Sequence, residues 1–342
     1  MQEKVVQKEA MPGFLQRLIG TAGTIAPVRQ PSGHYLLKPV ARADEVALDF
    51  PFLYYSAKEY LLPPGEPVLQ FGRREGKPFV TPETDTEELI LIGLHPCDLN
   101  AIWTYDAFFT ADQKDDDNFL ARRRHMTIVG LDCAKPCDEY SFCADMKTDV
   151  AQGGYDALLT DIGEAYFARA ATKRGEKLLA DMPAATAKHR AALADLAKAR
   201  PQKFPKRIEF DTAELPRRLE GSYDSLVWTA VARRCYSCGS CVLVCPTCFC
   251  FDLKDRLSLN LADGQRERWW DGCMLHAFAE VSGGENFRRE RHERLRHRMF
   301  RKGKYIAEQI GRPGCVGCGR CDRACTSKIS IVATYNQLKG GA

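Results

Sequence analysis

Two runs of closely spaced cysteines stand out in the sequence. Each run has three cysteines separated by two residues, and a fourth cysteine follows after three more residues. The runs are Cys235, Cys238, Cys241 and Cys245, and Cys315, Cys318, Cys321 and Cys325. This spacing is typical of the thiolate ligands of 4Fe-4S clusters. The chain therefore carries the ligands for two such clusters.

The spacing also predicts which cysteines share a cluster. In a loop that turns every third residue, three successive thiolates face one cluster, while the fourth faces a second cluster. We therefore expect the runs to exchange their last members. The first predicted set is Cys235, Cys238, Cys241 and Cys325, and the second is Cys315, Cys318, Cys321 and Cys245. The alternatives are structural zinc or disulfides, but paired zinc knuckles leave the third and fourth members of each run unused.

Further cysteines follow two predicted strands in the N-terminal half. Continuous apolar runs at 88–94 and 126–131 indicate buried strands. Cysteines come directly after both strands, where open α/β sheets form their sites. The group is Cys97, Cys133, Cys137 and Cys143. Four thiolates suffice for a third 4Fe-4S cluster, although buried free cysteines are also ordinary core residues.

Three cysteines are left over: Cys248, Cys250 and Cys273. They could replace a ligand assigned above, or hold an additional cluster with a non-cysteine ligand. From sequence alone we prefer a packing role, since buried cysteine behaves as a small hydrophobic residue. The segment 287–304 is rich in arginine and lysine. Such cations could stabilise anionic clusters, dock an acidic partner, or form a solvated helix.

Composition limits the class of protein. The chain has 342 residues, of which 45% are hydrophobic, and a net charge of +4. This length allows two domains, and the near balance of charge argues against nucleic-acid binding. The first ten residues lack the apolar run of a secretory signal, and no stretch is long enough for membrane insertion. We therefore expect a cytoplasmic protein, in which fifteen cysteines would stay thiols and could hold metal.

The remaining pattern predicts an α+β fold. A helix near 14–19 and strands at 24–28, 34–37, 46–52, 155–159 and 165–171 extend the N-terminal α/β domain. Apolar spacing around 277–281 and 295–300 predicts helices between the two cysteine runs. We expect an N-terminal α/β domain at 1–172, a helical connection at 173–222, and a mainly helical dicluster ferredoxin-type domain at 223–342.

Several motifs together resemble a known family. They are His-Pro-Cys-Asp-Leu at 95–99, Asp-Glu-Tyr-Ser-Phe-Cys at 138–143, Cys-Pro-Thr-Cys-Phe-Cys at 245–250, Trp-Asp-Gly-Cys at 270–273, Gly-Gly-Glu-Asn-Phe-Arg at 283–288 and Cys-Val-Gly-Cys-Gly-Arg-Cys at 315–321. The chain resembles beta subunits of cytosolic NiFe sulfhydrogenases, and is similar in outline to the electron-transfer subunit of anaerobic sulfite reductases. Two features depart from the family pattern: Thr326 replaces a proline, and Cys137 lies farther from Cys143 than expected.

The resemblance implies an iron–sulfur subunit that relays electrons. Its partners would be a flavoprotein subunit that binds NAD(P)H and the small and large subunits of a NiFe hydrogenase, or else a sirohaem sulfite reductase subunit. We expect no flavin or nicotinamide on this chain, because no G-x-G-x-x-G follows a strand. Two hypotheses from other classes remain: a self-contained enzyme using an open iron of the N-terminal cluster, and a metal-stabilised interaction protein.

Overall fold

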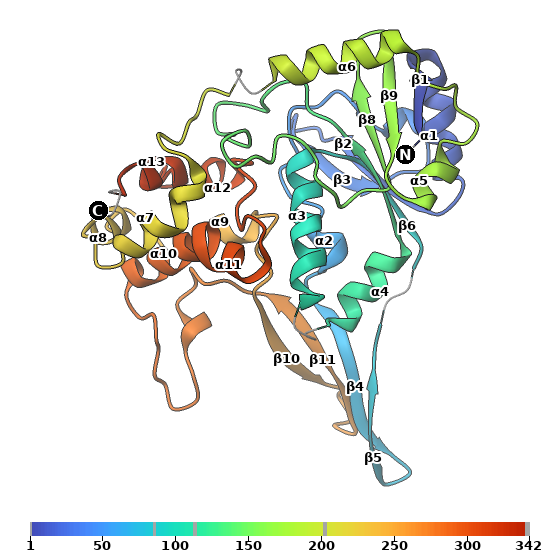
Figure 1. Cartoon of the computed structure of the whole chain (residues 1–342). Helices are drawn as coiled ribbons and strands as arrows, with labels where there is room; N and C mark the ends of the chain where they lie inside the picture. Colours follow the sequence, from blue (N-terminus) through green and yellow to red (C-terminus); the bar gives the residue numbers. More distant parts are fainter. Residues whose placement is uncertain (1, 85–86, 112–114, 201–203, 339–342) are drawn as a thin grey trace.

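The computed structural model describes residues 2–84, 87–111, 115–200 and 204–338. Figure 1 shows a sheet-based N-terminal body, a group of short helices beside it, and a long β-arm that extends from both. The prediction of an α/β domain followed by a mainly helical dicluster domain is confirmed.

A seven-stranded sheet forms the centre of the N-terminal body. Its inner strands β2, β6, β7 and β8 are parallel, and β1, β9 and β3 are antiparallel to their neighbours. In sheet order the strands are β1 (Glu3–Gln7), β9 (Ala165–Ala170), β8 (Ala157–Asp161), β7 (Met126–Leu131), β6 (Leu89–Leu94), β2 (Gly23–Arg29) and β3 (Tyr35–Pro39). Continuous apolar runs form β6 and β7 because strands at the centre of a parallel sheet are buried on both faces.

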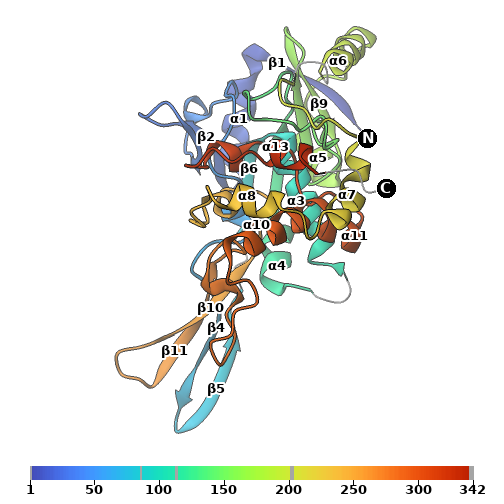
Figure 2. The ribbon, with the colours of Figure 1, turned by 90° about the vertical axis from the view of Figure 1, so that its left-hand side faces the viewer.

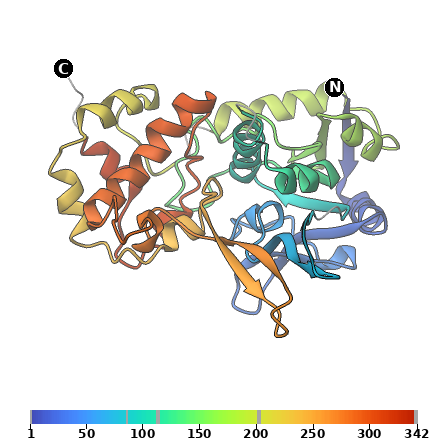
Figure 3. The same cartoon turned by 90° about the horizontal axis from the view of Figure 1, so that it is seen from below.

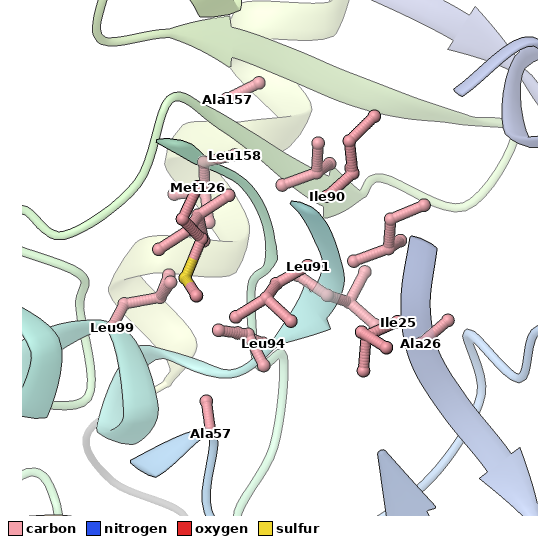
Figure 4. Packing of buried hydrophobic residues seen from close by; sticks show 14 of the residues in the cluster. Ile25, Ala26, Ala57, Ile90, Leu91, Leu94, Leu99, Met126, Ala157 and Leu158 are labelled. Atoms are coloured by element: carbon pink, nitrogen blue, oxygen red, sulfur yellow. The ribbon is translucent and has the colours of Figure 1, made fainter. Parts of the chain in front are cut away.

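Helices flank this sheet. They are α1 (Met11–Ile19), α2 (Lys58–Leu61), α3 (Pro96–Phe108), α4 (Asp117–His125), α5 (Lys173–Leu178) and α6 (Ala187–Ala199). Figure 4 shows the core beside the central strands, where Leu91 and Leu94 of β6 and Leu99 of α3 are fully buried. This packing fixes the carboxyl ends of β6 and β7, where the N-terminal cysteines begin.

One predicted strand is wrong. The segment 46–52 forms a loop after a 3-10 turn, η2 (Ala43–Glu45). It makes one backbone hydrogen bond to the sheet, from Ala47 N to Pro27 O at 2.8 Å. The two edges of β2 already pair with β3 and β6, so no edge of β2 is free to pair with segment 46–52. It crosses the sheet end instead and brings Phe50 to the cysteine sites.

Short helices surround a second core in the C-terminal part. They are α7 (Leu215–Gly221), α8 (Val227–Ala232), α9 (Ser240–Leu243), α10 (Arg291–Phe300), α11 (Ile306–Ile310), α12 (Arg320–Arg323) and α13 (Ile331–Asn336). A π-helical turn, η7 (Arg301–Tyr305), joins α10 to α11. Trp228, Met299 and Tyr335 are buried at its centre, and Figure 3 shows this bundle beside the sheet.

The segment between the cysteine runs differs from the prediction. It begins with a hairpin of β10 (Phe251–Leu257) and β11 (Asp263–Trp270), and the helix expected near 277–281 is only a 3-10 turn, η6 (Ala277–Ala279). The hairpin joins β4 (Glu66–Arg74) and β5 (Lys77–Pro82) in a four-stranded antiparallel sheet, ordered β10-β11-β4-β5. Figure 2 shows this sheet as an arm. Alternating polar and apolar residues in 251–257 are typical of a strand, and this signal was missed.

The domain boundaries 1–172, 173–222 and 223–342 stay a prediction. Helix α5, at the start of the predicted connection 173–222, packs against β8 and β9 of the N-terminal sheet. The arm takes two strands from each half of the chain. Both features tie the halves together.

Candidate iron–sulfur centres

The first predicted ligand set surrounds one cavity. Cys235, Cys238, Cys241 and Cys325 line a cavity of about 30 Å³. Backbone N–H groups point at the sulfurs: Ser237 N lies 3.4 Å from Cys235 Sγ, and Ile329 N lies 3.3 Å from Cys325 Sγ. Cys238 is exposed to solvent. The structure thus brings three cysteines of one run to the last cysteine of the other, as the spacing predicts, and one edge of the site reaches the surface.

The second set surrounds another cavity. Cys245, Cys315, Cys318 and Cys321 line a cavity of about 20 Å³ together with Arg298 and Lys302. The loop that carries them turns tightly at Gly317, which has φ of 60°. A Cβ at this glycine would lie 2.7 Å from the backbone of Cys143. Only glycine therefore allows the second run to approach the N-terminal cysteines so closely.

Buried cations lie beside these cavities. Lys58, Arg298 and Lys302 are each no more than 4% exposed, and none forms an ion pair with a carboxylate among residues 2–84, 87–111, 115–200 and 204–338. The ammonium of Lys302 donates to Thr247 Oγ1 at 2.6 Å and to Thr247 O at 3.1 Å. Burial opposes its charge, but the Cys245 and Cys248 thiols raise the pKa of Lys302 overall.

These cations test whether the cavities fit an iron–sulfur cluster. A buried cation without a partner is costly, and the Nε atoms of Arg294 and Arg298 have no hydrogen-bond partner in the described structure. Thiolate-ligated clusters are anionic, and their sulfurs accept hydrogen bonds. The charge and the free N–H groups therefore fit such clusters. Arg294, Arg298 and Lys302 of the basic segment 287–304 lie beside the cavities. Lys304 of the same segment instead pairs with Glu220 and Glu308.

The N-terminal cysteines gather beside the second site. Cys97 lies in the first turn of α3, Cys133 follows β7, and Cys137 and Cys143 lie in the next loop. Cys97 and Cys143 pack in one buried cluster with Cys318. Burial, followed by the neighbouring Cys97 and Cys137 thiols, raises the pKa of Cys143. The structure thus brings together all four predicted ligands of the third cluster.

One residue near this group was missed from the sequence. His95 lies at the end of β6, and its ring nitrogen and the sulfurs of Cys133 and Cys137 all lie within 4.8 Å of one another. A cavity of about 440 Å³ opens beside His95 and Cys133. The histidine was visible in the His-Pro-Cys-Asp motif, but only the cysteine was assigned a role.

The remaining cysteines lie next to the second site. The Cys245 thiol, through a hydrogen bond, and burial together raise the pKa of Cys248. Burial, followed by the nearby Cys250 thiol, raises the pKa of Cys273 to about 11. Lys58 reaches this region from the N-terminal half, where it donates to Leu243 O at 2.9 Å. Ligation by Cys248, Cys250 or Cys273 stays a prediction.

Comparison with known proteins agrees with this geometry. Residues 234–329 match the model of the 4Fe-4S dicluster domain, and this stretch contains both cysteine runs. Residues 234–329 therefore form a 4Fe-4S dicluster domain.

A full-length relative extends the comparison. The chain is 29% identical over 340 residues to sulfhydrogenase 2 subunit beta of Pyrococcus furiosus, and the alignment covers 98% of each chain. The predicted resemblance to sulfhydrogenase beta subunits is thereby confirmed along nearly the whole chain. No solved structure matches the chain. Within the described residues, no helix is long and apolar enough to cross a membrane.

Proposed function

We propose that this chain is the electron-transfer subunit of a multisubunit cytoplasmic oxidoreductase. It relays electrons between a flavoprotein subunit that binds NAD(P)H and the catalytic subunit of a NiFe hydrogenase. The chain itself holds 4Fe-4S clusters and no flavin or nicotinamide. Because iron–sulfur clusters move single electrons and a nicotinamide moves two, the flavin of the partner separates the pair.

The observation that carries this proposal is the pair of cavities lined crosswise by the two cysteine runs. Each cavity offers four thiols, and unpaired buried cations lie beside them. A disulfide framework would have no use for the cations. The ligands Cys235, Cys238, Cys241 and Cys325 hold cluster 1, and Cys245, Cys315, Cys318 and Cys321 hold cluster 2.

A third 4Fe-4S cluster extends the relay into the N-terminal domain through Cys97, Cys133, Cys137 and Cys143. Two contacts join it to cluster 2: the Cys143 sulfur lies 3.2 Å from Gly317 O, and Thr148 Oγ1 donates to Val316 O at 2.9 Å. Cys241 in α9 belongs to cluster 1, and Cys245, two residues beyond the end of that helix, belongs to cluster 2. The three centres thus lie in series.

Both ends of this series lie near the protein surface. Cys238 of cluster 1 is exposed, and Cys133 of the N-terminal centre borders the open 440 Å³ cavity. An electron carrier between two subunits needs such an accessible centre at each end. The middle centre, cluster 2, is more enclosed than cluster 1, since Cys245 and Cys315 are both buried.

Purification of the native complex under anaerobic conditions tests the proposed partners. We expect a flavoprotein, the hydrogenase small and large subunits, and nickel and flavin in proportion to this chain. Sirohaem without nickel would overturn the hydrogenase assignment in favour of an anaerobic sulfite reductase. A chain that purifies alone and turns over a substrate would instead favour a self-contained enzyme, for which the cavity beside Cys133 offers the space.

A further inference from the structure

His95 is held rigidly at the edge of the N-terminal centre. It lies between β6 and α3, and its carbonyl accepts N–H groups from Asp98 at 2.9 Å and Leu99 at 3.0 Å. Its ring stacks on Phe50, with centroids 4.3 Å apart and planes 4° apart. The residue is 6% exposed. The imidazole is therefore fixed by backbone and side-chain contacts on both sides.

The ring faces two thiols. Its nitrogen forms a tight group with the sulfurs of Cys133 and Cys137, all within 4.8 Å. The ring lies within hydrogen-bonding reach of the Cys137 thiol. Buried polar groups normally have partners, and an imidazole directed at two thiols is a typical metal-ligand arrangement.

Cys97 and Cys143 differ in the contacts of their sulfurs. Cys97 Sγ lies 3.9 Å from the Arg320 guanidinium, a donor that suits a thiolate, and 4.0 Å from Asp98 Oδ2. Cys143 Sγ lies 3.2 Å from Gly317 O. A carbonyl oxygen only accepts hydrogen bonds, so this contact gives a thiolate at Cys143 no donor like the one that Arg320 offers to Cys97. The surroundings of the Cys97 sulfur therefore suit a thiolate ligand better than those of the Cys143 sulfur.

The charges around the N-terminal centre also favour an imidazole ligand in place of one thiolate. Lys58, Arg298 and Lys302 have no carboxylate partner among the described residues. In contrast, Arg320 pairs with Asp98 at 2.7 Å, and Arg200 pairs with Asp132 at 2.7 Å. The surroundings of the N-terminal centre thus supply little uncompensated positive charge. They suit a cluster with one negative charge fewer, as a neutral imidazole in place of a thiolate would give.

We propose that the N-terminal cluster is bound by His95, Cys97, Cys133 and Cys137, with His95 in place of Cys143. The inference rests on the third cluster of the proposed function and changes one of its ligands. Replacement of thiolate by imidazole raises the potential of iron–sulfur centres. The N-terminal cluster then has a higher potential than its all-cysteine form, at the end of the relay that borders the open cavity.

Pulsed electron paramagnetic resonance (EPR) on the reduced full-length chain tests this ligand set. We expect a nitrogen coupling of a directly bound imidazole, which changes on labelling with ¹⁵N-histidine and is absent in His95→Cys. That variant keeps its iron, since cysteine also binds iron, and its third cluster has a lower potential. His297→Gln is the matched control and keeps the coupling. Cys143→Ser keeps the iron content and the coupling of the wild type.

Opposite results separate the two levels of the inference. About twelve irons per chain without nitrogen coupling, together with loss of about four in Cys143→Ser, would overturn the role of His95 and leave the third cluster intact. About eight irons in the wild type, with only two cluster signals, would overturn the third cluster itself. The proposed dicluster relay would survive that second result.

Discussion

Arg320 and Asp98 form a buried ion pair that joins the second cysteine run to the first turn of α3. Nη2 of Arg320 lies 2.7 Å from Oδ2 of Asp98, and the side chains are 3% and 1% exposed. The same guanidinium donates through Nε to Leu53 O at 2.9 Å. Three segments distant in sequence thus meet at one charge, between the N-terminal centre and cluster 2.

We predict that Asp98→Ala is strongly destabilising, because it leaves Arg320 buried without a carboxylate. The expected loss is about 3–5 kcal/mol in the free energy of unfolding, measured by anaerobic denaturant titration. Asp44→Ala is the control, since its pair with Arg42 is exposed and solvent screens such a pair, so its removal leaves the stability nearly unchanged. Equal losses in the two variants would contradict the structural role of the buried pair.

Lys302 lines the cavity of the proposed cluster 2, where its positive charge would stabilise the reduced, more negative form of the cluster. We predict that Lys302→Met lowers the potential of cluster 2. A unit charge roughly 8 Å away, in a medium of dielectric constant about 20, contributes about 2 kcal/mol, or roughly 90 mV for one electron. Potentiometric titration with EPR detection measures the shift.

Lys304→Met is the matched control two residues away. Lys304 pairs with Glu220 and Glu308 at the surface, so its loss leaves the potential of cluster 2 within error. A shift of the same size in both variants would mean that the effect is one of general charge rather than of a buried contact.

Gly317 and Gly311 provide a matched pair of glycines. Both have left-handed backbones, with φ of 60° and 67°. A Cβ at residue 317 would meet the Cys143 backbone at 2.7 Å, whereas residue 311 has open space. We predict that Gly317→Ala lowers the iron content, because the loop of cluster 2 must move, while Gly311→Ala costs only about 1 kcal/mol of strain. Equal iron in both variants would disprove the close approach.

His297 makes stability depend on pH. Burial, followed by the charges of Arg288 and Arg301, lowers the pKa of His297 from 6.5 to about 4. Between these pH values His297 is protonated in the unfolded chain but neutral in the folded chain. The free energy of unfolding therefore falls as the pH falls from about 6.5 toward 4. We predict a lower unfolding midpoint at pH 5.5 than at pH 7.5. His297→Gln reduces this difference, and an unchanged difference would assign it to other groups.

The sequence predicts the dicluster ligands because metal binding fixes both the residue type and its spacing. The parallel strands β6 and β7 are equally visible, since burial on both faces requires continuous apolar runs. Other features depend on contacts between distant segments. In the arm, β11 pairs with β4, and Lys58 donates to Leu243 O from the other half of the chain. No local sequence pattern predicts either contact. His95 adjoins a predicted ligand, yet only its position beside Cys133 and Cys137 makes it a candidate.

The crosswise sharing of cysteines is the central claim, and single substitutions in the two runs test it most directly. We measure iron, acid-labile sulfide and EPR spectra of anaerobically prepared wild type, Cys325→Ser and Cys245→Ser. Crosswise sharing predicts that Cys325→Ser perturbs the cluster of Cys235, Cys238 and Cys241, and that Cys245→Ser perturbs the cluster of the second run. Colourless protein with bound zinc, or a Cys325→Ser variant in which only the cluster of its own run changes, would contradict it.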